Sequence, residues 1–302
     1  MAADRRSASP GGTLYVVATP IGNLGDVTLR ALEVLGSVPL VAAEDTRVSR
    51  RLFARYEIAT PLVSYHARSG ERRLGKLLGH LRDGGDLALV TDAGTPGVSD
   101  PGDELVAAWT REGGRIVPVP GASAVLAAIA ASGIAGPRWS FEGFLPRSGR
   151  ERRQRIARIG HDERGTVLFE RPDRLAGTLA ELAEAAGGER PAAIGRELTK
   201  AHEEIVRGSL GELTERARSG GVVARGEAVI VVGWDDRVGP PQAAVTTPTL
   251  EAAWAEVERR VAAGQPRGVA AAAVAAETGL RRRDLYGAAR GPSSTHRDTL
   301  VE

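Results

Sequence analysis

Three glycine- and proline-rich segments carry polar side chains of the kind that bind small molecules. Their sequences are TPIGNLGDVTLRAL (19–32), TDAGTPGVSDPG (91–102) and VPGASA (119–124). Each follows a run of aliphatic and β-branched residues that predicts a strand. Loops at the carboxyl ends of parallel strands gather at one edge of an α/β sheet, and glycine lets a ligand approach the backbone closely. The pattern favours a small-molecule pocket over plain strand-to-helix turns.

The elements that must position these loops alternate between strands and helices. We expect strands at 14–18, 40–43, 61–65, 87–91 and 116–119, and helices near 28–35, 71–82, 103–112 and 123–132. Such alternation predicts right-handed crossovers and a mainly parallel sheet.

The spacing of elements changes after Gly136 and Pro137. Further strands are expected at 139–144, 166–169, 192–197, 203–207 and 227–232, with helices near 150–159, 174–186 and 210–219. Two of these strands follow each other closely within 192–207, so this second sheet is expected to be mixed. The sequence therefore predicts the following order: a disordered N-terminus (1–12), an N-terminal α/β domain (13–136), a C-terminal α/β domain (137–234), a linker (235–248) and a helical extension with a loose tail (249–302).

Composition excludes several classes of protein. The chain has 302 residues, 42% of them hydrophobic and 26% charged, which excludes wholesale disorder. Its apolar runs are shorter than the roughly 20 residues of a membrane span, and its first residues lack the apolar segment of a secretory signal. It has no cysteine and its five histidines show no ligand spacing, so we expect no metal site. The cytoplasm is the expected compartment.

Basic residues are almost all arginine, since only Lys76 and Lys200 are lysines. A GC-rich coding bias explains most of this excess, so the position of the arginines is more informative than their number. Segment 147–158 holds six arginines against one glutamate, a net charge of +5. Its alternative interpretation is a solvated helix face, whereas guanidinium groups suit phosphates and stacked bases. The candidates for RNA contact are Arg47, Arg147, Arg150, Arg152 and Arg153.

Six motifs, in this order, closely resemble the ribosomal RNA small subunit methyltransferase I family of tetrapyrrole-methylase-like enzymes. They are TPIGNLGDVTLRAL, AAEDTR (42–47), DAGTPGVSDPG (92–102), VPGASA, EGFLPR (142–147) and RELTK (196–200). The match covers about 13–234, and AAAVAAETGLRRRDLY (271–286) is similar to the family's C-terminal extension. The resemblance implies two α/β domains with S-adenosylmethionine in the cleft between them, usually in a homodimer.

The resemblance also implies an activity and a binding site. The activity is 2′-O-methylation of a decoding-site cytidine in 16S rRNA, so the partner is the small ribosomal subunit and neither DNA nor a membrane is expected. By the same analogy, the cofactor site is lined by Pro20, Ile21, Asp92, Ala93, Gly94, Ser123 and Ala124.

A ribose hydroxyl is a poor nucleophile, so a base or a charge that lowers its pKa should help the reaction. Candidates are Glu44 and Asp45, just after one strand, and Glu197 and Lys200 in a similar place after another. Lys200 is the more telling choice, because coding bias converts tolerant lysines to arginine and a retained lysine points to a need for its titratable ammonium. A surface lysine retained by chance is the alternative. Glu170 and Arg171 are expected to pair structurally across the domain interface.

Two rival functions stay open at this stage. One is a tetrapyrrole C-methyltransferase on the same scaffold, although a porphyrinoid substrate requires neither the arginine cluster nor the helical tail. The other is an RNA-binding ribosome assembly factor that keeps the pocket without turnover. Transfer of a methyl group to RNA would exclude the second.

Overall fold

The computed structural model of the chain describes residues 11–223, 225–235, 250–278 and 280–286. They fall into two compact units, Met1–Val238 and Gly239–Glu302. Among the residues that the structure describes, the first unit contains two five-stranded sheets and the second contains three helices. Within these described ranges, no helix is long and apolar enough to cross a membrane.

The first sheet is entirely parallel and has the strand order β3-β2-β4-β1-β5. Its strands are β1 (Thr13–Val17), β2 (Leu40–Ala43), β3 (Leu62–Ser64), β4 (Leu87–Val90) and β5 (Arg115–Val119). Parallel strands need cover on both faces, which explains the continuous apolar runs in β2 and β4. The predicted parallel sheet is confirmed.

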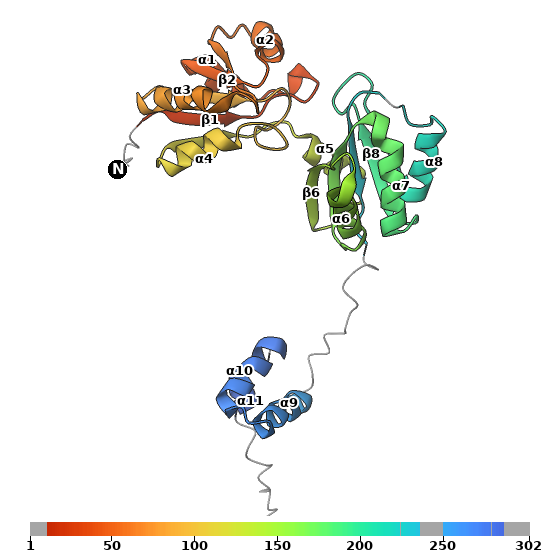
Figure 1. Cartoon of the computed structure of the whole chain (residues 1–302). Helices are drawn as coiled ribbons and strands as arrows, with labels where there is room; N and C mark the ends of the chain where they lie inside the picture. The colour runs from red at the N-terminus through yellow and green to blue at the C-terminus, as the bar shows by residue number, and fades with distance from the viewer. Residues whose placement is uncertain (1–10, 224, 236–249, 279, 287–302) are drawn as a thin grey trace, which may run out of the picture. The chain divides into compact units, whose positions relative to one another are not determined.

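Helices cover both faces of this sheet. They are α1 (Leu29–Ser37), α2 (Thr46–Arg55), α3 (Gly70–Arg82) and α4 (Asp103–Arg111), and the short 3-10 helix η1 (Leu24–Asp26) precedes α1. Figure 1 shows the first sheet flanked by helices α1 to α4. Leu35 of α1 and Phe53 of α2 pack on one face, while Leu81 of α3 and Trp109 of α4 pack on the other. Helix α2 is missing from the sequence-based prediction, because four arginines dilute the apolar period of its TRVSRRLFAR sequence.

The second sheet is mixed, as expected, and has the order β6-β7-β10-β8-β9. Its strands are β6 (Trp139–Phe144), β7 (Gly165–Glu170), β8 (Pro191–Arg196), β9 (Glu204–Ser209) and β10 (Ala228–Val232). Only β6 and β7 pair in parallel; the other three pairs are antiparallel. Short loops, such as the one that joins β8 to β9, allow antiparallel neighbours, whereas parallel strands need a longer crossover.

Helix α5 (Ala124–Ser132) packs on one face of the second sheet through Val125 and Ala128. The other face is covered by α6 (Gly149–Gly160), α7 (Leu175–Ala186) and α8 (Leu210–Arg218), and the 3-10 helix η2 (Pro172–Arg174) leads into α7. Because α5 follows β5 directly, it connects the loops of the first sheet to the packing of the second.

Edge strand β6 contains a β-bulge. Phe141 lies opposite Val167 and Phe144 lies opposite Phe169, so three residue steps in β6 span two in β7. Gly143 accommodates the irregularity with a φ of +61°, in the region that favours glycine. Side chains alternate along a regular strand, so the extra residue brings Phe144 to the same face as Phe141.

The second unit has its own small core. Helices α9 (Leu250–Ala262), α10 (Arg267–Thr278) and α11 (Arg282–Tyr286) enclose residues such as Val257, Val274 and Leu285. The indole nitrogen of Trp254 donates a hydrogen bond to the Asp284 carbonyl at 2.8 Å. The described part of the expected extension is therefore helical, whereas its tail, most of the linker and the first ten residues lie outside the described ranges.

Candidate functional site

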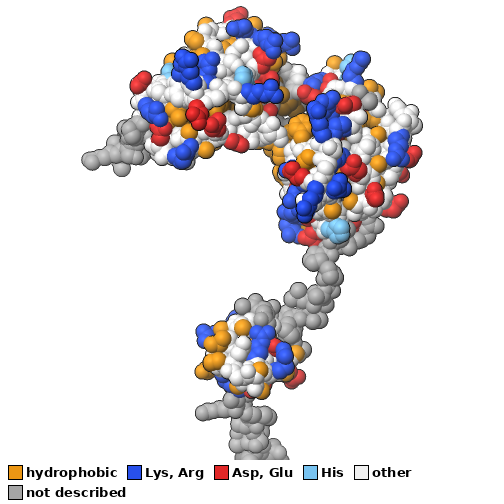
Figure 2. Space-filling model, in the orientation of Figure 1, with side chains coloured by type: hydrophobic (Ala, Val, Ile, Leu, Met, Phe, Trp, Pro, Cys, Tyr) orange, Lys and Arg blue, Asp and Glu red, His pale blue; other side chains and the backbone are white. Residues whose placement is uncertain are grey.

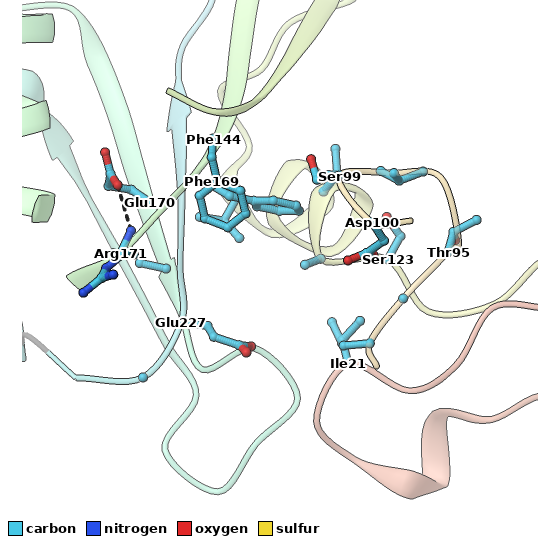
Figure 3. Close-up of a pocket in the computed structure, with 18 of the residues that line it drawn as sticks. Ile21, Thr95, Ser99, Asp100, Ser123, Phe144, Phe169, Glu170, Arg171 and Glu227 are labelled. Carbon is cyan, nitrogen blue, oxygen red and sulfur yellow. Dashed lines mark hydrogen bonds between the residues drawn. The ribbon is translucent and has the colours of Figure 1, made fainter. Parts of the chain in front are cut away.

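A pocket of about 250 Å³ opens beyond the carboxyl ends of β1, β4 and β5. This volume is near the lower end for small-molecule sites, about 300 Å³. The loops that follow these strands form one wall, and residues from the second sheet form the other. Figure 3 shows Ser99, Asp100 and Ser123 across the pocket from Phe144 and Phe169.

Five of the seven predicted cofactor residues line this pocket: Ile21, Ala93, Gly94, Ser123 and Ala124. Pro20 and Asp92 line a smaller neighbouring pocket together with Leu24 and Phe53. The structure therefore brings all three predicted loops together and separates these two residues from the main pocket. A sequence motif identifies the loop, but alternate residues within a loop face different sides.

Hydrogen bonds between backbones hold the first two loops against each other. The amide of Thr19 donates to the Gly94 carbonyl at 2.8 Å, and the amide of Gly94 donates to the Thr19 carbonyl at 3.0 Å. In the third loop, the Ser123 hydroxyl accepts from the Leu126 amide and caps α5. The positive end of the α5 dipole therefore faces the pocket, where it favours an anionic group.

The second wall was missed in the sequence-based prediction of cofactor residues. It includes Phe144, Phe169, Glu170, Arg171 and Glu227. Phe144 belongs to the EGFLPR motif, whereas Glu227 stands alone before a strand and gave no signal. The loops of the first sheet can be recognised in the sequence by their glycine and proline residues. The second wall has no such signal, because its residues come from strand ends that are far apart in the sequence.

Glu170 is fully buried, and both Glu170 and Arg171 form structural ion pairs, but their partners among the described residues belong to the same C-terminal α/β domain and do not lie across the domain interface as expected. Only the Arg171 amide reaches Glu170, at 2.9 Å, while the Arg171 guanidinium pairs with Asp173. The Glu170 carboxylate instead accepts from the Thr178 hydroxyl at 2.6 Å. The guanidinium of Arg174 lies 3.5 Å from it.

Arg152 requires a correction, because it is 6% exposed and is unsuited to contact RNA. Its guanidinium pairs with Glu181 at 2.8 Å, donates to the Thr178 hydroxyl and to the Pro146 carbonyl, and lies 3.9 Å from Glu170. A buried charge must be paired in this way to offset its desolvation. Arg152 therefore anchors the chain beside the pocket instead of facing solvent.

Arg147, Arg150 and Arg153 are exposed, and within the described ranges no acidic side chain pairs with them. Figure 2 shows basic side chains gathered over the part of the second sheet that carries α6. Two further arginines of the run are already engaged, since Arg155 pairs with Glu151 and Arg158 with Glu142. We call the three unpaired residues the arginine surface.

Lys200 is held between two carboxylates. Its Nζ lies 2.9 Å from Glu197 and 3.0 Å from Glu227, and Glu227 lines the pocket. Burial lowers the pKa of Lys200, but the two hydrogen bonds outweigh it and raise this pKa above its ordinary value. The hydrogen bond from Lys200 in turn lowers the pKa of Glu197. The raised pKa keeps Lys200 cationic at neutral pH, which favours an electrostatic role for it over that of a general base.

The loop that carries Lys200 contacts the first loop. The Asn23 amide donates to the Thr199 hydroxyl at 3.2 Å. A Cβ at position 22 would lie 2.4 Å from the Lys200 Cγ, so only glycine leaves room for this side chain. Glu197 and Thr199 both have positive φ, at 48° and 66°, which is uncommon outside glycine.

Glu44 and Asp45 lie apart from Lys200, and no hydrogen bond or ion pair among the described residues joins the two groups. The Glu44 carboxylate accepts from the Thr91 hydroxyl at 2.7 Å. Asp45 caps α2 and pairs with Arg47 at 2.6 Å. The hydrogen bond from Arg47 lowers the pKa of Asp45 to about 2, so Asp45 is a weak base with a structural task.

Asp100 is a pocket-lining carboxyl group with a strongly shifted pKa. Burial, with a contribution from the neighbouring Glu44 charge, raises the pKa of Asp100 to about 6. Burial and Glu44 likewise raise the pKa of Asp92. Three carboxyl groups near one another cannot all ionise freely, because like charges disfavour the ionised forms.

Comparisons with known proteins identify relatives that match most of the chain. The model of the tetrapyrrole (corrin/porphyrin) methylases matches residues 13–214. A protein of Synechocystis sp. named ribosomal RNA small subunit methyltransferase I is 43% identical over 281 residues, 91% of this chain and 96% of the relative. The protein of the same name from Bacillus subtilis is 40% identical over 277 residues, 92% of this chain and 94% of the relative.

Solved structures show the same fold. A cobalt precorrin-4 methyltransferase has a TM-score of 0.56 at 22% identity, over 76% of this chain and 96% of that chain. Uroporphyrin-III C-methyltransferase of Thermus thermophilus, solved with S-adenosylhomocysteine, has a TM-score of 0.52 at 22% identity, over 74% and 97%. These likenesses concern the fold alone, and they confirm the predicted fold class.

Proposed function

This chain belongs to the ribosomal RNA small subunit methyltransferase I group of the tetrapyrrole (corrin/porphyrin) methylases, and on that premise we propose that it 2′-O-methylates a decoding-site cytidine in 16S rRNA. It is an rRNA methyltransferase that uses S-adenosylmethionine. The observation that carries the finer proposal is that the exposed arginine surface begins three residues after Phe144, which lines a pocket formed by both sheets.

The residues of the pocket fit S-adenosylmethionine. When bound, this cofactor supplies a methyl group on a sulfonium centre. The N-terminus of α5, at Ser123 and Ala124, suits its carboxylate, and the carboxyl groups of Asp100 and Glu227 suit its positive charges. Ile21 and Ala93 offer apolar contact to an adenosine group.

The protein's own groups then position the ribose and stabilise charge on it. A methyl transfer of this kind is an in-line displacement, so alignment of the two reactants accounts for much of the acceleration. Lys200, kept cationic by Glu197 and Glu227, would stabilise negative charge that develops on the attacking oxygen. As the oxygen–methyl bond forms, the hydroxyl proton would be released to solvent water, and the thioether S-adenosylhomocysteine would be the leaving group. Glu44 remains a proposed participant in catalysis. It would act on the second loop through the hydrogen bond that its carboxylate accepts from Thr91.

The arginine surface is proposed to bind the phosphates that flank the target nucleotide. Arg47 is 84% exposed at its side chain and offers a further contact from the first sheet, although Asp45 already engages its guanidinium. Guanidinium groups also bind the carboxylates of a tetrapyrrole, but such a substrate has no phosphate chain along which the three residues of the arginine surface would make successive contacts.

The decisive experiment compares three acceptors for a labelled methyl group: small subunits that lack the modification, naked 16S rRNA, and uroporphyrinogen. The label on RNA should survive alkaline hydrolysis as a dinucleotide resistant at one cytidine, because a 2′-O-methyl group blocks cleavage there. Transfer to a base, or to uroporphyrinogen alone, would contradict the proposal. Bound cofactor with no transfer at all would favour an assembly factor. Sedimentation of the same sample tests the predicted homodimer.

A further inference from the structure

Phe144 is an aromatic ring that lines the pocket but is poorly covered. It is 53% exposed, although burial of an aromatic ring ordinarily stabilises a protein. Its ring contacts Phe169 with centroids 5.4 Å apart and planes at 55°, and Phe169 packs edge-on against Phe141. These tilted contacts support the ring from one side. Figure 3 shows Phe144 beside Phe169, facing the wall that carries Ser99 and Ser123.

The β-bulge of β6 is what aims this ring at the pocket. Without the extra residue, Phe144 would share a face with Glu142, whose carboxylate pairs with Arg158 of α6 on the opposite side of the sheet. Ser99 of the second loop lies close to the bulge, because a Cβ atom built on Gly143 would be only 3.0 Å from the Ser99 Oγ. Bulges beside active sites commonly redirect a side chain, so the exposure of Phe144 is a built feature.

We propose that Phe144 is the platform on which the base of the target nucleotide stacks. The inference rests on the proposed function and adds the element that recognises the nucleotide within the pocket. Phe144 stands across from Ala93 and Ser123, the wall assigned to the cofactor, and Arg147 of the arginine surface follows three residues later. An open ring beside unpaired guanidinium groups matches the chemistry of an unstacked base and its phosphates.

The test measures equilibrium binding of the full-length protein to unmodified small subunits and to naked 16S rRNA, with S-adenosylhomocysteine present so that no turnover occurs. Phe144→Leu should weaken binding about 5- to 150-fold, which corresponds to the loss of 1–3 kcal/mol for one stacked base. Phe144→Trp should restore most of the affinity, because a larger ring still stacks. Affinity for S-adenosylhomocysteine, measured by calorimetry, should stay unchanged in both variants.

Trp139 supplies a matched control, because it is another partly exposed aromatic residue of β6, at 38%, that does not line the pocket. Trp139→Leu should leave rRNA affinity unchanged. Wild-type affinity in Phe144→Leu would overturn the proposal, and so would a loss of cofactor affinity, which would assign the ring to the adenine. If Phe144→Leu loses its fold, Phe144→Met takes its place. This experiment measures binding and not methyl transfer. Methylation of an atom other than the 2′ oxygen would therefore contradict the proposed function but would leave the comparison of the Phe144 variants unchanged.

Discussion

The Nζ of Lys200 lies 3.0 Å from a carboxylate oxygen of Glu227, which lines the pocket directly before central strand β10. This contact links a lysine from the RELTK motif to an acidic residue that no motif marks. It also determines the kind of chemistry that Lys200 can do, because a lysine shared by two carboxylates keeps its proton.

We therefore expect Lys200→Ala to lower the single-turnover rate of methyl transfer by ~10²–10³-fold, the usual loss for a group that stabilises a developing charge. Lys200→Arg should recover much of that loss, since it keeps the positive charge. The rate should show no titration of Lys200 near neutral pH, because its pKa is raised. If Arg were as damaging as Ala, the electrostatic role would be wrong.

Substitution at the N-terminus of α5 tests the cofactor site. Ala124→Trp places a large side chain in the pocket and should reduce affinity for S-adenosylmethionine by more than tenfold, or about 1.4 kcal/mol. Ala130→Trp is the control, because Ala130 lies on the same helix but is exposed outside the pocket. Calorimetry on the two folded variants gives the comparison, and equal affinities would remove α5 from the site.

Reversal of the arginine surface tests the RNA contact. The triple change Arg147→Glu, Arg150→Glu and Arg153→Glu should weaken rRNA binding and reduce the salt slope by roughly 2–3, if each arginine neutralises about one phosphate. The double change Arg216→Glu and Arg218→Glu, on exposed positions of α8, shows the effect of charge reversal away from α6, and the two slopes are compared per arginine reversed. Binding titrations at several salt concentrations measure both. A salt slope equal to that of the wild type would show that the arginine surface is only solvated and does not contact RNA.

Arg152 should behave in the opposite way to its neighbour Arg153. Arg152→Met leaves Glu170 with Arg174 as its remaining cation and should cost roughly 3 kcal/mol of unfolding free energy, the lower end for breaking a buried pair. Arg153→Met, at an exposed position, should change stability by no more than about 0.5 kcal/mol. Urea unfolding separates the two, and similar values for both would contradict the buried network.

Asp100 predicts a pH dependence of stability. Its folded pKa of about 6 lies above the ordinary value of 3.8, so the folded state binds the proton more tightly than the unfolded state. The stability that this group contributes is therefore complete below pH 3.8 and is lost as the pH rises through about 6. Asp100→Asn lacks this loss. The Tm of Asp100→Asn minus the Tm of the wild type should therefore rise between pH 4 and pH 7. A difference that stays constant over this range would show that the pKa of Asp100 has its ordinary value.

The sequence predicts this fold well wherever a periodic signal and a turn signal coincide. The strands before the three glycine-rich loops are examples, because their apolar runs are bounded by TPIG, TDAG and PGAS. Helix α2 was missed because four of its ten residues are arginine, which dilutes its apolar period. Arg152 and Arg153 are adjacent and chemically identical, and only tertiary packing decides which one is buried. Glu227 escaped for the same reason, since its partner Lys200 is 27 residues away.

The left-handed backbone at Glu197 and Thr199 has a consequence for the history of the sequence. Each such residue costs on the order of 1–3 kcal/mol, and Thr199 is β-branched, which makes its conformation less favourable still. Selection for a durable protein alone would place glycine at both positions. This chain instead keeps the carboxylate that grips Lys200 and the hydroxyl that receives the Asn23 amide. The turn thus gives up some stability in favour of activity. We expect glycine at position 197 or 199 to stabilise the turn and to lower the methyl-transfer activity.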